Sequence, residues 1–188
     1  MGDTSRDPKD LHPLLREAWD HLRADFEQRF PGGPKPRLSA TYRGPKDQQR
    51  AFESGRSRVR YGHSLHNFKP AYAFDIFFDN GDGTANWDWE HFEAFAQEAK
   101  RIGLEWGGDW PGLRDGPHFQ FLAATPAHAR DGVIPMPPNV PKGGWLLVLM
   151  VNGETVQTVP MQGESNVVTR SAPERRRYYV DVRSVDDA

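Results

Sequence analysis

The segment of residues 71–78 constrains the fold of this chain more than any other. Its side chains alternate in character, and large apolar residues occupy every second position: Tyr72, Phe74, Ile76 and Phe78. Because successive side chains of a strand point to opposite faces, the alternation predicts a strand with one buried face. Asp75 lies on the other face, with the small side chain of Ala73 beside it. The core must therefore hold a strand that carries a carboxylate on its opposite side.

Helical patterns stand on both sides of this strand in the sequence. Residues 13–30 carry apolar side chains at spacings of three and four, which predicts an amphipathic helix that ends at the Pro31–Gly33 turn. Residues 87–102 repeat the pattern and end at Gly103. We also expect a shorter helix that begins at Pro45, and short strands over 37–42, 104–106 and 117–122. The mixture predicts an α+β domain.

Composition limits the possible classes of protein. The 188 residues suffice for one ordinary domain with a core, and no apolar run approaches the roughly 20 residues that span a bilayer. A net charge of -2 gives no general field for nucleic acid or anionic lipid. The first ten residues are polar and lack the apolar stretch of a signal peptide. We therefore expect synthesis in the cytoplasm, no nucleic-acid partner and no membrane insertion.

A change of composition divides the chain. Residues 131–144 contain four prolines, which suits an extended linker better than a helix or a central strand. We expect residues 1–130 to form one main domain. Residues 145–188 form a small β-rich unit of unknown role, in which Asn152 and Gly153 between two strand-like runs indicate a hairpin.

Three residues suggest a metal site. His66 lies in a loop that leads into the strand of Asp75, and His118 follows the tight turn Asp115, Gly116 and Pro117. The chain has no Cys, so metal ligands must come from His, Asp or Glu. Two imidazoles and one carboxylate are a ligand set of hydrolytic zinc sites, in which the fourth position holds water. Taken alone, the spacing leaves surface or capping roles for these residues open.

Four short motifs resemble those of a known family. They cover residues 64–67, 73–76, 105–110 and 115–120, and read SLHN, AFDI, EWGGDW and DGPHFQ. They are similar, in the same order, to motifs of the VanY-type D-alanyl-D-alanine carboxypeptidases and L-alanyl-D-glutamate endopeptidases. These are zinc enzymes with the Hedgehog/DD-peptidase fold. The resemblance implies a small antiparallel sheet with flanking helices.

The resemblance also implies roles for individual residues. It implies one zinc ion per chain, bound by His66, Asp75 and His118, with Asp115 as the catalytic base. Arg43 matches the family's arginine near the reacting carbonyl, where a guanidinium stabilises a developing oxyanion. Candidate substrate contacts are Ser64, Gln48, Trp106 and Trp110. One departure is that the segment from His66 to Asp75 is longer than the family's commoner spacing and has Pro70 and Ala71 where a Gly is usual.

The turn before His118 predicts the bond that is cut. Asp115 to His118, with the motif of residues 105–110 just upstream, is similar to the L-alanyl-D-glutamate endopeptidases of phage endolysins. We therefore expect cleavage of the peptidoglycan stem peptide at that bond, after release through a pore at lysis. A D-alanyl-D-alanine carboxypeptidase and a non-catalytic wall-binding module of the same fold are the alternatives. We expect His63 and the acidic segment 79–90 to be ordinary loop residues, and leave calcium binding by that segment open.

Overall fold

The structure is a computed structural model that describes residues 2–134, 145–151, 154–161 and 178–184. The chain divides into two compact units, Met1–Pro135 and Met136–Ala188. The boundary between them lies within the predicted linker, whose residues 135–144 are outside the described part of the chain. Each unit is described by itself.

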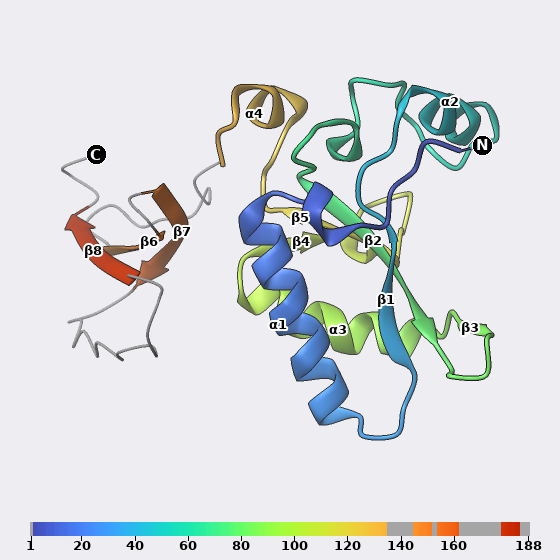
Figure 1. Cartoon of the computed structure of the whole chain (residues 1–188), viewed down its shortest axis with the longest axis horizontal. Coiled ribbons are helices and arrows are strands. Elements are labelled where there is room, and N and C mark those ends of the chain that lie inside the picture. Colours follow the sequence, from blue (N-terminus) through green and yellow to red (C-terminus); the bar gives the residue numbers. More distant parts are fainter. Residues whose placement is uncertain (1, 135–144, 152–153, 162–177, 185–188) are drawn as a thin grey trace. The chain divides into compact units, whose positions relative to one another are not determined.

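An antiparallel sheet forms the centre of the first unit (Figure 1). Strand β2 lies between β1 and β5, β4 pairs with the outer side of β5, and a short β3 pairs with the end of β2. The register places Asp75 of β2 opposite His118 of β5. The strands are β1 (Lys35–Ala40), β2 (Ala73–Asp79), β3 (Ala85–Asn86), β4 (Leu104–Trp106) and β5 (His118–Phe121).

Two helices cover one face of this sheet, α1 (Pro13–Arg29) and α3 (Trp89–Arg101) (Figure 1). Aromatic rings join the layers at 4.9 to 5.9 Å between centroids, and the pairs are Trp19 with Phe74, Phe26 with Phe78, and Phe95 with Phe119. The predicted alternation in β2 is therefore confirmed, because its large apolar side chains lie in the core. Burying them leaves Asp75 and its neighbour His118 on the opposite face.

Shorter helices complete the unit. The predicted helix at Pro45 is α2 (Pro45–Glu53), and single turns of 3-10 helix occur at η1 (Pro8–Asp10), η2 (Leu65–Asn67) and η3 (Gly107–Asp109). Helix α4 (Pro126–Asp131) was not predicted. Thr125 caps its start and Gly132 ends it with φ of 70°, as is usual for a helix of this kind. The α+β class and the antiparallel sheet with flanking helices are confirmed.

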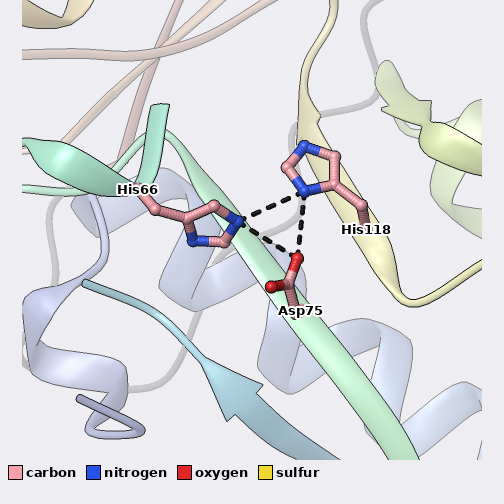
Figure 2. A group of neighbouring side chains, drawn as sticks. All are labelled: His66, Asp75 and His118. Atoms are coloured by element: carbon pink, nitrogen blue, oxygen red, sulfur yellow. Dashed lines mark hydrogen bonds and ion pairs between the residues drawn. The ribbon is translucent and has the colours of Figure 1, made fainter. Parts of the chain in front are cut away.

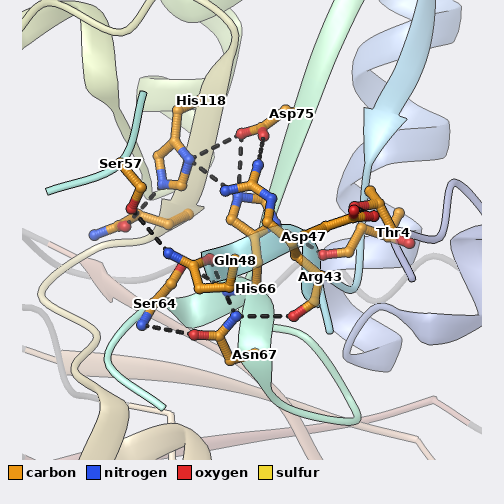
Figure 3. Close-up of polar contacts among 12 residues, drawn as sticks. Thr4, Arg43, Asp47, Gln48, Ser57, Ser64, His66, Asn67, Asp75 and His118 are labelled. Carbon is orange, nitrogen blue, oxygen red and sulfur yellow. Dashed lines mark hydrogen bonds and ion pairs between the residues drawn. The ribbon is translucent and has the colours of Figure 1, made fainter. Parts of the chain in front are cut away.

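The polar N-terminal residues are part of this unit. The side chain of Asp3 accepts hydrogen bonds from the backbone N–H groups of Lys46 and Asp47 at the start of α2, at 2.9 and 2.8 Å. In return, the Asp47 carboxylate accepts from the Thr4 hydroxyl at 2.8 Å (Figure 3). Thr4 forms a β-bridge with Arg43. The N-terminal residues thereby fix the segment that carries Arg43.

The longer segment between His66 and Asp75 follows a defined path. The Tyr72 N–H donates to the Leu65 carbonyl at 3.0 Å, which closes the segment into a loop. At its far side, Ala71 donates to the carbonyl of Asp10 at 2.7 Å and accepts from the N–H of His12 at 2.9 Å. The extra length is thus tied to the start of the chain.

The described part of the second unit is a three-stranded antiparallel sheet in the order β7-β6-β8. Its strands are β6 (Trp145–Val151), β7 (Glu154–Met161) and β8 (Tyr178–Ser184). The predicted turn at Asn152 and Gly153 lies outside the described residues. The assignment of a separate role to this unit stays a prediction.

We predict that a protein ending at Pro135 folds without the second unit. The core of the described residues lies between Leu11 and Ala129, so the truncated chain retains both layers of the first unit. Thermal unfolding followed by circular dichroism should show one cooperative transition. A truncated protein that aggregates, or that unfolds without a cooperative transition, would show that residues after Pro135 complete the core.

Candidate active site

Three predicted ligands meet on the polar face of the sheet (Figure 2). His66 comes from η2, Asp75 from β2 and His118 from β5. The Nε2 atom of His66 lies 3.1 Å from Asp75 Oδ1 and 3.2 Å from His118 Nδ1, and the last two atoms are 3.0 Å apart. Among the described residues, this is the one group of three or more His and acidic side chains arranged to hold a metal, and the acidic segment after β2 forms none.

The spacing of these atoms suits a small cation. Ligand atoms about 2.0 to 2.1 Å from a tetrahedral zinc ion are about 3.3 Å apart. The three distances between ligand atoms here, 3.0 to 3.2 Å, are close to that value. Both rings are almost completely buried, with 1% of His66 and 7% of His118 exposed. The donor set therefore fits a metal ion.

The far side of the His66 ring confirms which nitrogen faces the cluster. Its Nδ1 atom lies 2.8 Å from the backbone carbonyl of Thr41. Since a carbonyl oxygen only accepts, Nδ1 carries the hydrogen and Nε2 keeps its lone pair. Metal-binding histidines are commonly fixed in this way.

Both carboxylate oxygens of Asp75 have partners. Its Oδ2 accepts from the Arg43 guanidinium at 2.8 Å, while Oδ1 faces the two imidazoles (Figure 3). Burial by itself would raise the pKa of Asp75, but the charges and hydrogen bonds of His66 and His118 outweigh it and hold the pKa well below its ordinary value. The carboxylate is therefore ionised and available as a ligand.

The Asp75 carboxylate also changes the pKa of His118. Burial lowers the pKa of His118, but its hydrogen bond and charge interaction with Asp75 outweigh burial and raise the pKa above the ordinary value. In the metal-free protein a proton therefore competes for the cluster, and metal binding must release it.

Asp115 lies in the turn before His118, as predicted. Its backbone N–H donates to the Gly107 carbonyl at 2.9 Å, and its own carbonyl accepts from the N–H of His118 at 3.2 Å. Burial raises the pKa of the Asp115 carboxyl, and the negative charge of Asp75 raises it further. A carboxylate with a raised pKa is a stronger base than an exposed one.

The two glycines of the EWGGDW motif make room for this turn. A Cβ atom on Gly107 would lie 2.7 Å from the Asp115 carbonyl oxygen and 3.1 Å from the His118 Cβ. A Cβ atom on Gly108 would lie 2.2 Å from the Trp106 ring. Gly107 therefore excludes a side chain because η3 packs directly against the segment that carries Asp115 and His118, and Gly108 excludes one because the Trp106 ring lies against it.

Two of the predicted substrate contacts have structural roles. Gln48 has no exposed surface, and its amide group bonds Ser57, Val59 and Asn67 (Figure 3). Its prediction as a substrate contact stays a prediction, which this burial does not support. Ser64 caps η2 by accepting from the His66 N–H at 3.4 Å. Substrate binding by Ser64 stays a prediction.

The two predicted tryptophans differ. Trp106 is 3% exposed and donates its indole N–H to the carbonyl of Gly116 at 2.7 Å, so it packs in the core. Its contact with substrate stays a prediction. Trp110 is half-buried and lies against the His118 ring, with centroids 4.9 Å apart. Contact of Trp110 with substrate stays a prediction.

The sequence reasoning missed two residues that shape the site. Asn67 donates to the carbonyl of Arg43 at 2.8 Å, and its side-chain oxygen accepts from the N–H of Ser64 at 3.1 Å. Glu105 bonds Gln120 across the register of β4 and β5. Asn67 lies in the SLHN motif and Glu105 in the EWGGDW motif, and this position within the motifs is the feature of the sequence that could have indicated their roles.

Comparison with known proteins agrees with this geometry. Residues 58–121 match the sequence profile of a family described as D-alanyl-D-alanine carboxypeptidase. The matched segment contains all three candidate ligands and Asp115. Over these residues the chain is similar to this peptidase family. The resemblance seen in the sequence is thereby confirmed, and peptidases of this family are metal-dependent.

Relatives of this peptidase extend the comparison. The peptidoglycan L-alanyl-D-glutamate endopeptidase CwlK of Bacillus subtilis (strain 168) is 29% identical, over 61% of this chain and 75% of that protein. The L-alanyl-D-glutamate peptidase of Listeria phage A118 is 59% identical over 27 residues, which are 14% of this chain and 10% of the phage protein. The crystal structure of the Serratia marcescens L-Ala D-Glu endopeptidase ChiX has a TM-score of 0.46 and 25% identity, and the match covers 63% of this chain and 87% of that one.

We predict that the peptidase loses its bound metal when either imidazole is removed. His66→Ala and His118→Ala each leave two ligand atoms of the three, so elemental analysis should find little divalent metal in either purified protein. His63→Ala is the control, because His63 is exposed and lies outside the cluster. Full metal content in both ligand variants would show that the metal is bound elsewhere.

Proposed function

We propose that this peptidase is a zinc enzyme that hydrolyses the L-alanyl-D-glutamate bond of the peptidoglycan stem peptide. The observation that carries the proposal is the convergence of His66, Asp75 and His118 beside Asp115. The names of CwlK and the phage peptidase support the substrate and the bond.

One zinc ion per chain is the proposed cofactor, held by His66 Nε2, Asp75 Oδ1 and His118 Nδ1. When bound in such a site, zinc lowers the pKa of its water to about 7 and polarises a carbonyl oxygen. Three protein ligands would leave the fourth position of such an ion for water.

The surrounding residues have separate roles in this proposal. Asp115 accepts the proton of the attacking water and later returns it to the leaving amine, as a general base and then a general acid. Arg43 keeps Asp75 in place through its bond to Oδ2. A guanidinium has five N–H donors, so Arg43 also has donors to direct at the developing oxyanion.

A D-alanyl-D-alanine carboxypeptidase is the second candidate, because the matched family carries that description. It would recognise the free terminal carboxylate of the stem, whereas an endopeptidase lets the peptide continue through the site. A wall-binding module without turnover is disfavoured, because binding alone has no use for the base Asp115.

The proposed place of action is the cell wall, where the substrate lies. No helix of the described residues has the length and apolar character needed to cross a membrane. Release through a pore at lysis stays a prediction.

We predict that Asp115→Asn abolishes most of the activity and keeps the metal. Asparagine has nearly the same shape, but it cannot accept the proton, so turnover of peptidoglycan should fall about a hundredfold or more. Metal content should equal that of the wild-type protein. Asp109→Asn is the matched control, because Asp109 lies in the adjacent η3 and, among the described residues, its carboxylate pairs with Lys100 on the surface. Near-normal turnover by Asp115→Asn would remove Asp115 from the mechanism.

We predict that digestion of purified peptidoglycan leaves L-alanine on the muramyl sugar and frees peptides that begin with D-glutamate. Mass spectrometry of the fragments identifies the cut bond, and a chelator should prevent the digestion. Release of terminal D-alanine with the L-alanyl-D-glutamate bond intact would identify the carboxypeptidase instead.

A further inference from the structure

A path of hydrogen bonds runs behind the proposed ligand atom of His118. The other ring nitrogen, Nε2, lies 3.0 Å from Oε1 of Gln120. The amide nitrogen of Gln120 donates to Oε2 of Glu105 at 3.1 Å. The indole N–H of Trp110 donates to Oε1 of the same carboxylate. Because the Trp110 ring also packs against His118, the path begins and ends at neighbouring rings.

The chemistry of these groups fixes which of them donates and which accepts in each hydrogen bond. An indole nitrogen only donates, and an ionised carboxylate only accepts, so both oxygens of Glu105 are acceptors. Gln120 must therefore turn its NH₂ group to Glu105 and its carbonyl oxygen to His118. That oxygen selects the imidazole form with hydrogen on Nε2. Nδ1, which faces Asp75 Oδ1 at 3.0 Å, is then the nitrogen left for the metal once its own proton is released.

We propose that Glu105 and Gln120 are positioning residues that select the form of His118 able to bind metal. The inference rests on the proposed metal site, because it describes how that site is prepared. Neither residue has to touch metal or substrate. The two stand opposite each other in the register of β4 and β5, so the sheet itself aligns them.

The two histidines differ in this respect. His66 is oriented by the backbone carbonyl of Thr41, which no substitution of a side chain removes. His118 is held by side chains at both ring nitrogens, by Gln120 at Nε2 and by Asp75 at Nδ1. Substitutions of side chains can therefore change which ring nitrogen of His118 carries hydrogen. The same substitutions should leave the hydrogen of His66 on Nδ1, so His66 serves as a control in the same spectra.

Glu105→Gln should reverse that choice. A glutamine side chain has one acceptor oxygen, so it cannot accept from both Trp110 and Gln120. If it keeps the bond from Trp110, its NH₂ group faces Gln120, which turns over and presents its own NH₂ group to His118. The affinity for zinc, measured by competition with a chromophoric chelator, should fall about ten- to a hundredfold. The Nε2–H signal of His118 should disappear from ¹⁵N NMR spectra of the metal-free protein, recorded at a pH where the ring is neutral.

Exchanging the two residues should restore the path. In the double variant Glu105→Gln with Gln120→Glu, the new carboxylate accepts from His118 Nε2–H and from the new amide. The oxygen of that amide accepts from Trp110, so the charge and the number of bonds are conserved. Zinc affinity and the Nε2–H signal should both return to wild-type values.

Glu93→Gln is the matched control, because the Glu93 carboxylate accepts from the indole N–H of Trp89 at 2.7 Å and its described bonds include none to a histidine. Its zinc affinity should equal that of the wild-type protein. The proposal is overturned by a folded Glu105→Gln protein with unchanged zinc affinity, or by a folded exchange variant that binds zinc as weakly as Glu105→Gln does.

The wild-type protein gives an independent test that needs no variant. A neutral His118 ring with its hydrogen on Nδ1 would overturn the proposal, and hydrogen on Nε2 supports it. If the wild-type protein binds no zinc in the same titration, the proposed function fails. The form of the His118 ring in the metal-free protein still decides the role of Glu105 and Gln120.

Discussion

The carboxylate of Asp75 is the group on which the site depends. Its Oδ1 lies 3.1 and 3.0 Å from ring nitrogens of His66 and His118, and its Oδ2 accepts from Arg43 at 2.8 Å. An ionised carboxylate inside a protein is costly unless it is paired and hydrogen-bonded. All three partners must therefore be in place together. They come from separate segments of the chain, so the site forms only when the sheet has formed.

The two faces of the central strands carry different side chains, apolar ones in the core and polar ones in the candidate site. On one face, Phe74 and Phe119 stack at 5.5 Å and bury apolar surface under α1 and α3. On the other face, the neighbouring positions carry Asp75 and His118. Because side chains alternate along a strand, packing of the first pair fixes the direction of the second. The apolar core thereby positions the polar cluster.

The N-terminal segment provides the support for two parts of the site that the sheet does not hold directly. It bridges to Arg43 through Thr4, and it bonds the loop between His66 and Asp75 at Ala71. The longer spacing between these ligands is therefore compatible with a compact cluster. Periodicity could not predict this arrangement, because hydrogen bonds between distant backbone segments leave no pattern in a polar sequence.

The sequence by itself determined the main helices, the strand of Asp75, and the identity of the candidate ligands, since these follow from periodicity and from motifs of local chemistry. It did not indicate α4, whose short length gives too few positions for a periodic signal. Only the tertiary structure decided which ring nitrogens face the cluster, and that Gln48 and Trp106 are buried. Burial and hydrogen-bond direction depend on neighbours from distant segments, so they exist only once the chain has folded.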